Sequence, residues 1–233
     1  MRRPVGPWTP AVHALLNHLH AVGFTAAPRA LGIDDRGREV LSYVPGEAAH
    51  PGRPDVLESD RGLVRVGRLI RDFHDAVAGF VPPPEPRWQV LIPADGTEII
   101  GHHDLAPWNL VVGDRWVFID WDTAAPGTRL WDLAYAAHGF VPLSADPQRS
   151  RRDAAARLGL FVDAYGLDDA QRRGLLTRLA PRTRSMADFL AAQAALGNQP
   201  WTRLWYEGHG RSWSADAAYI ERHTADWTRA LLG

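Results

Sequence analysis

The sequence predicts an α+β protein with a small mixed N-terminal portion, a centre of short strands and polar loops, and a helical C-terminal half. Three observations lead to this prediction. Two strand-like runs at 28–33 and 38–44 are separated by turn residues, and a second pair lies at 110–112 and 116–119. After residue 127 the apolar residues recur mostly at helical spacing to the end of the chain.

The N-terminal elements follow from local signals. Thr9 and Pro10 are typical of a helix start, apolar residues then follow at helical spacing, and Gly23 ends the helix. Residues 34–37 read Asp-Asp-Arg-Gly and predict the turn between the first two strands. Pro45 and Gly46 break the second strand, and the polar, proline-rich stretch that follows is expected to be a hinge or an exposed connection.

The later elements are predicted in the same way. One face of a long helix carries Leu63, Val66, Ile70, Phe73 and Val77. An extended linker is expected at 82–86, a strand at 98–101 and a turn at 113–115. The remaining helices are predicted at 131–139, 148–165, 168–179, 183–196 and 213–231.

Composition limits the possible function classes. The chain has 233 residues, of which 45% are hydrophobic and 23% charged, so it can bury a substantial core. Its formal charge of −1 gives no general attraction to nucleic acid or to an anionic membrane. No run of about 18 apolar residues and no signal peptide is visible, so we expect a cytoplasmic protein without a membrane or nucleic-acid partner.

Two residue types are absent from the sequence. Without cysteine the chain has no disulfide, thiolate metal site or cysteine nucleophile. All 26 basic side chains are arginine, so a Walker A lysine and lysine Schiff-base chemistry are excluded as well.

The most informative segment places an amide and three acids around the central strands. Asp104 and Asn109 lie in a loop before the third strand-like run, and Asp120 and Asp122 follow the fourth. A loop carboxylate can orient an attacking hydroxyl or accept its proton. Carboxylate and amide oxygens are the ligands that Mg²⁺ prefers. The set therefore indicates phosphoryl transfer, with Asp104 as base and the other three near a metal.

Several motifs resemble the aminoglycoside phosphotransferase and choline kinase-like families. The segment 102–109, His-His-Asp-Leu-Ala-Pro-Trp-Asn, is similar to their His-x-Asp-x-x-x-x-Asn catalytic loop. The segment 118–122, Phe-Ile-Asp-Trp-Asp, resembles their Ile-Asp-Trp-acid segment, the counterpart of the protein-kinase Asp-Phe-Gly. Further similarity lies at 130–134, 69–75 and 39–47, and the resemblance as a whole runs from about residue 9 to the C-terminus.

The resemblance implies a protein-kinase-like bilobal fold with a truncated N-terminal lobe at 1–47 and a large, mostly helical C-terminal lobe at 48–233. It implies an O-phosphotransferase that takes ATP or GTP and Mg²⁺ and acts on a small-molecule hydroxyl of an aminoglycoside, a choline-like amine or a sugar-like acceptor. The resemblance implies that Ser42, Tyr43 and Val44 bind the nucleotide and that Asp104 is the catalytic base. It implies that Asn109 and Asp120 bind magnesium, with Asp122 adding negative charge to the metal site. His102 and Asp132 would support the loop.

The chain departs from these families at its N-terminus. Only eight residues precede the first helix, so a phosphate-covering glycine-rich hairpin is missing. Arg2 or Arg3 is the candidate for the cation that pairs with phosphate, with Arg3 preferred, and His13 lies where the partner glutamate is expected. Either the protein starts upstream of Met1, or the chain is an abbreviated kinase fold.

Other hypotheses stay open. The chain can be a non-catalytic nucleotide-binding or interaction protein on a kinase-like scaffold. A hydrolase that uses His102, His103 and Asp120 as metal ligands is a weaker alternative, because adjacent histidines seldom bind one metal.

The C-terminal region is not acidic overall, and its aromatic residues either line an acceptor site or pack between helices. The acceptor, the choice between ATP and GTP, and the oligomeric state are not determined by the sequence. The candidate aromatic residues are Trp201, Trp205, Tyr206 and Trp213.

Overall fold

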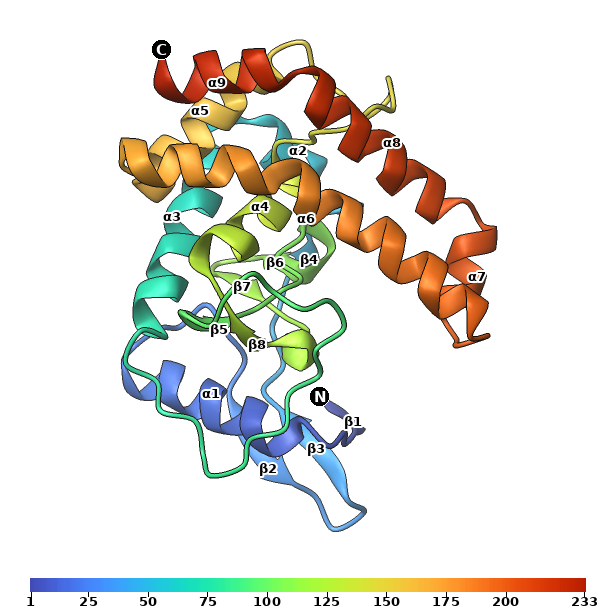
Figure 1. The fold of residues 1–233 in the computed structure, drawn as a ribbon. Helices are drawn as coiled ribbons and strands as arrows, with labels where there is room; N and C mark the ends of the chain where they lie inside the picture. The colour runs from blue at the N-terminus through green and yellow to red at the C-terminus, as the bar shows by residue number, and fades with distance from the viewer.

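The computed structural model describes the backbone of residues 1–233 and every side chain except that of Leu57. Short strands lie near the N-terminus and in the centre, and helices make up the C-terminal half (Figure 1). The N-terminal elements occupy one end of the molecule and the C-terminal helices the other, with the central strands between them. The predicted α+β fold with a helical C-terminal half is therefore confirmed.

The N-terminal sheet is antiparallel, with β3 (Arg38–Leu41) between β1 (Arg2–Pro4) and β2 (Ala30–Ile33). Helix α1 (Thr9–Ala21) has a proline in its first turn, as predicted, and contacts β2. It buries Val12, Leu15, Leu16 and Leu19, the apolar side chains that follow at helical spacing. The helix and the predicted hairpin are both confirmed, and together they hold β1 beside the centre of the molecule.

Two smaller antiparallel sheets form the centre. In one, β6 (Leu110–Val112) lies between β4 (Glu47–Ala48) and β7 (Trp116–Phe118). In the other, β5 (Ile99–Gly101) pairs with β8 (Ala125–Gly127).

Strand β8 contains Pro126 and Gly127, and the sequence pattern predicts no strand there. Because β8 pairs with one strand, the missing N–H of Pro126 can lie on the unpaired side. The lobe boundary proposed between residues 47 and 48 falls inside β4 and stays a prediction.

The helices differ in several places from the sequence pattern: the helix predicted at 148–165 begins at Ala154, and the pattern predicts no helix at 54–58 or at 201–206. Residues 168–196 were expected to form two helices, but α6 (Asp169–Ala195) is continuous through Pro181. The proline costs about 3 kcal/mol in a helix interior, and buried side chains on both sides of it offset this cost because α6 packs against four other helices. Residues 213–231 were expected to form one helix and form two, broken at His223. The remaining helices are α2 (Pro54–Glu58), α3 (Asp60–Ala76), α4 (Arg129–Phe140), α5 (Ala154–Tyr165), α7 (Trp201–Tyr206), α8 (His209–Arg222) and α9 (Thr224–Leu232).

The core connects the long helix α3 to the central loops. Phe73 on α3 is fully buried and meets the indole of Trp121 edge to face, with ring centroids 5.0 Å apart. Trp121 in turn lies 4.6 Å from the His102 ring and donates a hydrogen bond to the Phe118 carbonyl. Burying side chains of this size stabilises the fold by about 1.5–3 kcal/mol each. This packing fixes the loops that begin at His102 and end near Asp122.

Among the helices that the structure describes, none combines the length with the apolar character that a membrane crossing requires.

Candidate active site

A buried carboxylate at the start of α4 holds the loop that contains Asp104. Asp132 is completely buried, and the backbone N–H groups of His102 and His103 each donate to it at 2.8 Å. His74 Nε2 lies 3.2 Å from the same carboxylate, and its other ring nitrogen lies 2.7 Å from the Tyr165 hydroxyl. Burial alone would raise the pKa of Asp132, but the His74 hydrogen bond and the neighbouring imidazoles hold this pKa well below its usual range.

The two histidines of the loop bond to backbone. His102 Nε2 lies 3.1 Å from the Ile119 carbonyl oxygen, and His103 Nε2 lies 3.0 Å from that of Ala125. Burial lowers the pKa of His103, so its ring is neutral near pH 7. Among the described side chains, no group of three histidines, cysteines or acids is arranged to hold a metal. This geometry disagrees with the hydrolase hypothesis, which requires His102, His103 and Asp120 on one ion.

Asp104 is half-buried, and two neutral donors hold its carboxylate. Asn109 Nδ2 donates to Asp104 Oδ2 at 2.7 Å and to the Asp104 carbonyl at 3.0 Å. The Tyr135 hydroxyl donates to Asp104 Oδ1, also at 2.7 Å. Burial and the nearby Asp104 charge raise the pKa of Tyr135 well above its ordinary value, so the phenol keeps its proton. The sequence motif predicts the Asp104–Asn109 pair but gives no reason to select Tyr135.

A buried arginine lies behind Asp104, and no sequence motif indicates it. Arg182 on α6 is 2% exposed and donates to the His103 carbonyl at 3.0 Å. Its guanidinium lies 4.3 Å from the centroid of the Tyr135 ring. Burial lowers the pKa of Arg182, while Tyr135, Asp132 and Asp104 act in the opposite direction. The site therefore contains a fixed positive charge on the side of the catalytic loop that faces the C-terminal helices.

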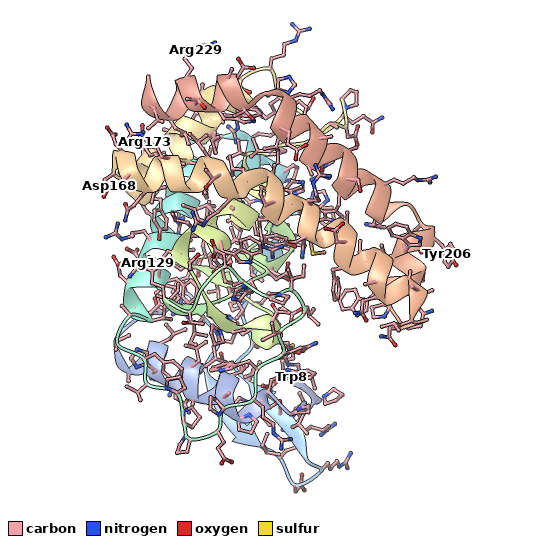
Figure 2. The ribbon with its side chains drawn as sticks, viewed as in Figure 1. Trp8, Arg129, Asp168, Arg173, Tyr206 and Arg229 are labelled. Atoms are coloured by element: carbon pink, nitrogen blue, oxygen red, sulfur yellow. The ribbon has the colours of Figure 1, made fainter. Side chains whose placement is uncertain are left out.

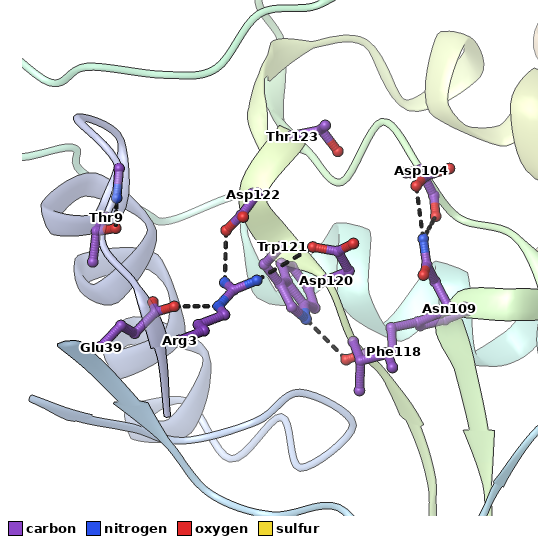
Figure 3. Close-up of polar contacts among 12 residues, drawn as sticks. Arg3, Thr9, Glu39, Asp104, Asn109, Phe118, Asp120, Trp121, Asp122 and Thr123 are labelled. Carbon is purple, nitrogen blue, oxygen red and sulfur yellow. Dashed lines mark hydrogen bonds and ion pairs between the residues drawn. The ribbon is translucent and has the colours of Figure 1, made fainter. Parts of the chain in front are cut away.

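Asp120 and Asp122 meet a single arginine from β1 (Figure 3). Arg3 Nη2 donates to Asp122 at 2.6 Å, and Arg3 Nη1 lies 3.4 Å from Asp120. Asp120 has φ of 61° and ψ of 66°, a left-handed conformation, and its side chain is 53% exposed. Burial raises the pKa of Asp122 against the opposing effect of Arg3. Arg2 instead faces Asp34, so only one of the two candidate arginines lies at the acids.

The partner of Arg3 on the opposite side is Glu39 of β3, which is 1% exposed. Glu39 also lies 2.8 Å from His13 Nε2, so His13 of α1 reaches the arginine only through this carboxylate. Burial lowers the pKa of Arg3, but the Glu39 hydrogen bond and the charges of Asp122 and Asp120 outweigh it and raise the pKa. The family resemblance predicts that the acid paired with this arginine lies on the first helix. In the structure it comes from strand β3 instead.

The predicted nucleotide-binding residues Ser42, Tyr43 and Val44 follow strand β3. The Ser42 N–H donates to the Arg29 carbonyl at 2.9 Å, and the Arg29 N–H donates back to the Ser42 hydroxyl. Tyr43 is 77% exposed. Within the part of the chain that the structure describes, the N–H groups of Tyr43 and Val44 have no backbone acceptor. The nucleotide-binding role of this segment stays a prediction.

The oxygen donors fit a magnesium ion. Asp120 offers an exposed carboxylate with one long contact to Arg3, and Asn109 offers an amide oxygen beside Asp104. Mg²⁺ is commonly bound through one or two carboxylates, with phosphate oxygens and water completing the octahedron. The Asp122 carboxylate is already bound by Arg3, so its contribution to the ion stays a prediction.

A cavity of about 1100 Å³ opens beside these groups and extends between the catalytic loop and the C-terminal helices. Asp104, Asp120 and Asp122 are among the residues that line it. Of the four aromatic residues proposed as a wall, Trp201 and Trp213 line the cavity. Trp205 instead lies against Gly210, and Tyr206 at the outer end of α7 is 78% exposed (Figure 2).

Comparisons with known proteins agree with this geometry. Residues 85–175 match the phosphotransferase enzyme family. The trifolitoxin immunity protein of Rhizobium leguminosarum bv. trifolii is 36% identical over 196 residues, which are 76% of this chain and 71% of that protein.

Two solved structures are similar in fold. A choline/ethanolamine kinase family protein from Mesorhizobium loti has 16% identity and a TM-score of 0.63, over 97% of this chain and 84% of its own. An amicoumacin kinase in complex with AMP-PNP, Ca²⁺ and Ami has 14% identity and a TM-score of 0.66, over 98% of this chain and 80% of its own. At these identities the similarity confirms the kinase-like fold alone.

Proposed function

The chain belongs to the phosphotransferase enzyme family, and we propose that it transfers the γ-phosphoryl group of ATP or GTP to a hydroxyl of a small molecule in a Mg²⁺-dependent reaction. One observation carries this proposal. Asp104, held by Asn109 and Tyr135, lines the same cavity as Asp120 and Asp122. A base, a metal-binding carboxylate and an acceptor cavity therefore meet at one place.

Asp104 is suited to orient and deprotonate the acceptor. Each of its carboxylate oxygens accepts one hydrogen bond, so each keeps a further lone pair for the incoming hydroxyl. The acceptor oxygen would attack the γ-phosphorus while its proton passes to Asp104. The bond from the γ-phosphorus to the bridging oxygen would break, and the nucleoside diphosphate would leave. Positioning of this kind and neutralisation of charge supply most of the catalysis in phosphoryl transfer.

Arg3 is suited to pair with the phosphates of the nucleotide. Its guanidinium is charged at neutral pH and lies between Glu39 on one side and Asp120 and Asp122 on the other. A guanidinium binds phosphate oxygens in pairs, which compensates in part for the absence of lysine. Bound Mg²⁺ would be held by Asn109 and Asp120 and would neutralise negative charge on the phosphates. The free N–H groups near Tyr43 and Val44 would meet the base of the nucleotide.

The acceptor is proposed from the names of the relatives. A choline/ethanolamine kinase, an amicoumacin kinase and a trifolitoxin immunity protein are all similar to this chain. An acceptor panel therefore contains choline, ethanolamine, an aminoglycoside, a sugar, amicoumacin and trifolitoxin.

The deciding experiment measures transfer of labelled γ-phosphate to this panel with ATP and with GTP. We expect transfer with Mg²⁺ and none after chelation with EDTA. Asp120→Asn should lose the activity, whereas Asp114→Asn, an exposed aspartate in the turn after β6, is the matched control and should keep it.

The alternative, a non-catalytic nucleotide-binding protein, predicts another result. Nucleotide would bind in the presence of Mg²⁺, but neither the panel nor water would receive phosphate. That combination would rule out the proposed activity and favour the alternative.

A further inference from the structure

The helical wall of the cavity is mostly apolar. This wall is the part of the lining that α4, α6, α7 and α8 contribute; α2 adds Pro54 and Glu58 elsewhere, and Asp104, Asp120 and Asp122 line the same cavity. The apolar and aromatic members of this wall are Tyr135, Met186, Phe189, Leu190, Trp201, Leu204 and Trp213. Such a wall favours a ligand with an extensive apolar surface.

The charges of this wall leave no carboxylate free for a cation. Asp216 is the only acid that the lining receives from α4, α6, α7 and α8, and it is 3% exposed. Its oxygens lie 2.8 Å from His138 Nε2 and accept from the Ser144 hydroxyl at 2.9 Å and from the Ala145 N–H at 2.7 Å. The buried Arg182 adds positive charge to the same wall. A polycation packed against α4, α6, α7 and α8 would therefore find no free carboxylate on these helices; the other acids of the lining, Glu58, Asp104, Asp120 and Asp122, lie on other elements.

Three stacked rings, Tyr135, Trp213 and His138, lie on the helical wall, and the first of them is hydrogen-bonded to Asp104. Tyr135, which donates to Asp104, lies nearly parallel to the Trp213 ring, with an interplanar angle of 12° and centroids 5.9 Å apart. Trp213 also stacks on His138, with centroids 4.3 Å apart. A flat apolar group that packs on Trp213 would therefore lie within the length of a small molecule from Asp104.

The size of the cavity also favours a large ligand. Its volume of about 1100 Å³ lies just above the range for pockets that hold drug-sized ligands, which is about 300–1000 Å³. The predicted nucleotide-binding residues 42–44 are not among the residues that line it, whereas most of the lining comes from the C-terminal half of the chain. A molecule as small as choline would leave most of the wall without a contact.

We propose that the acceptor is a bulky hydroxyl compound with an apolar or aromatic body that stacks on Trp213, and that it carries no cluster of positive charges. This inference rests on the proposed phosphotransferase function and narrows its acceptor class. It disfavours the aminoglycosides and the choline-like amines that the sequence left open.

The first test measures binding without turnover. The aromatic anion 1-anilinonaphthalene-8-sulfonate serves as the probe, and its fluorescence on the whole protein reports its Kd. Trp213→Ala should weaken this binding about tenfold, because it removes a stacking partner and buried apolar area. Trp213→Phe keeps an aromatic face and should lie within about threefold of the unchanged protein. Tyr206→Ala is the control, because Tyr206 is an exposed aromatic residue on the same helical arm.

Competition then tests the charge. Kanamycin, a polycation, should not displace the probe at concentrations up to the millimolar range. Displacement by kanamycin at micromolar concentration, or equal probe binding by Trp213→Ala and Tyr206→Ala, would overturn the inference. Thermal unfolding of both variants shows whether the fold is retained, and Trp213→Phe carries the test if Trp213→Ala unfolds.

The transfer assay separates this inference from the proposed function. Chloramphenicol, a neutral aromatic alcohol, should exceed kanamycin and choline as acceptor by at least about tenfold in kcat/KM. The reverse order would overturn the acceptor class and leave the phosphotransferase proposal standing. Loss of all Mg²⁺-dependent transfer, to water included, would instead remove the proposed function, while the probe measurements would still report on the cavity.

Discussion

The catalytic loop and the N-terminal strand beside it are held in opposite ways. The loop that contains Asp104 is fixed by Asp132, which is completely buried and is bonded to two backbone N–H groups of the loop and to the His74 imidazole. Arg3 on β1 is held by an ion pair to the buried Glu39 and by two more exposed ones, to the half-buried Asp122 and to Asp120, whose side chain is 53% exposed. The buried contacts fix one geometry, whereas exposed ion pairs exchange partners at little cost.

This difference matches the work that each region would do. A base must be held in place before the acceptor arrives, so a rigid loop is favourable. A phosphate-binding cation must leave its resting carboxylates when nucleotide and metal enter. Arg3 can do this because its contacts to Asp120 and Asp122 lie at the edge of the cavity that the acids line.

The largest expected effect concerns the buried side of the comparison. Asp132→Ala should lower the free energy of unfolding by about 3–5 kcal/mol, because it leaves His74 and two N–H groups buried without their partner. Asp163→Ala, which removes an exposed aspartate paired with Arg172, should cost less than about 1 kcal/mol. Denaturant unfolding measures both values. Equal costs would show that the loop is not held by Asp132.

The second prediction concerns the exposed side. Arg3→Ala should lower kcat/KM for the nucleotide about a hundredfold, because a charged donor to the transferring phosphates is lost. Arg3→Lys should recover part of the loss, since it restores the charge without the paired donors. Arg2→Ala is the neighbouring control, because Arg2 faces Asp34, and should change kcat/KM less than about twofold. Similar losses in Arg2→Ala and Arg3→Ala would contradict the assignment.

A third prediction tests the link between the loop and the helical wall. Tyr135→Phe removes the donor to Asp104 Oδ1 and keeps the ring that stacks near Trp213. We expect kcat to fall about tenfold, as for loss of a hydrogen bond to a charged group, with the KM for nucleotide unchanged. Steady-state kinetics at several pH values measure this. An unchanged kcat would show that Tyr135 serves packing alone.

The sequence reveals the part of this site that is local along the chain. Asp104, Asn109 and Asp120 lie at fixed spacing around two strands, so the order of residues is enough to infer their chemistry. Tyr135 and Arg182 reach the loop from α4 and α6, which only the tertiary fold brings there. The one local signal for Tyr135 is that it lies three positions after Asp132, on the same face of a helix.

Two further features depended on tertiary packing in the same way. Glu39 binds Arg3 from a strand, because β1 and β3 pair with Arg3 opposite Glu39. No residue near Glu39 in the sequence predicts that it pairs with Arg3 across these strands. Pro181 predicts a helix break, and packing of α6 against α4 and α8 prevents it. Local rules therefore located most elements, and failed where burial on several sides decided the outcome.

The smallest expected effect is a pH dependence in the buried region. Burial lowers the pKa of His138 from its ordinary 6.5. As the pH falls below about 6.5, His138 is therefore protonated in the unfolded chain before it is protonated in the folded chain. Stability should therefore decline as the pH falls from about 6.5 toward 5, by roughly 1 kcal/mol or less from this residue. His138→Gln should flatten the decline, while His209→Gln, at a half-exposed position, should leave it as it is. Unfolding midpoints at pH 7 and pH 5 measure the slopes, and equal slopes in all three proteins would exclude His138 as a cause.

The most direct test of the account is the phosphoryl transfer rate of Asp104→Asn, measured with labelled ATP and Mg²⁺ on the best acceptor of the panel and on water. Asparagine keeps the size of the side chain and cannot take the proton. We predict that kcat falls by about 10²–10⁴-fold, with nucleotide affinity and the unfolding midpoint close to those of the unchanged protein. Equal transfer rates in the two proteins would contradict the assignment of Asp104 as the catalytic base, and with it the central claim.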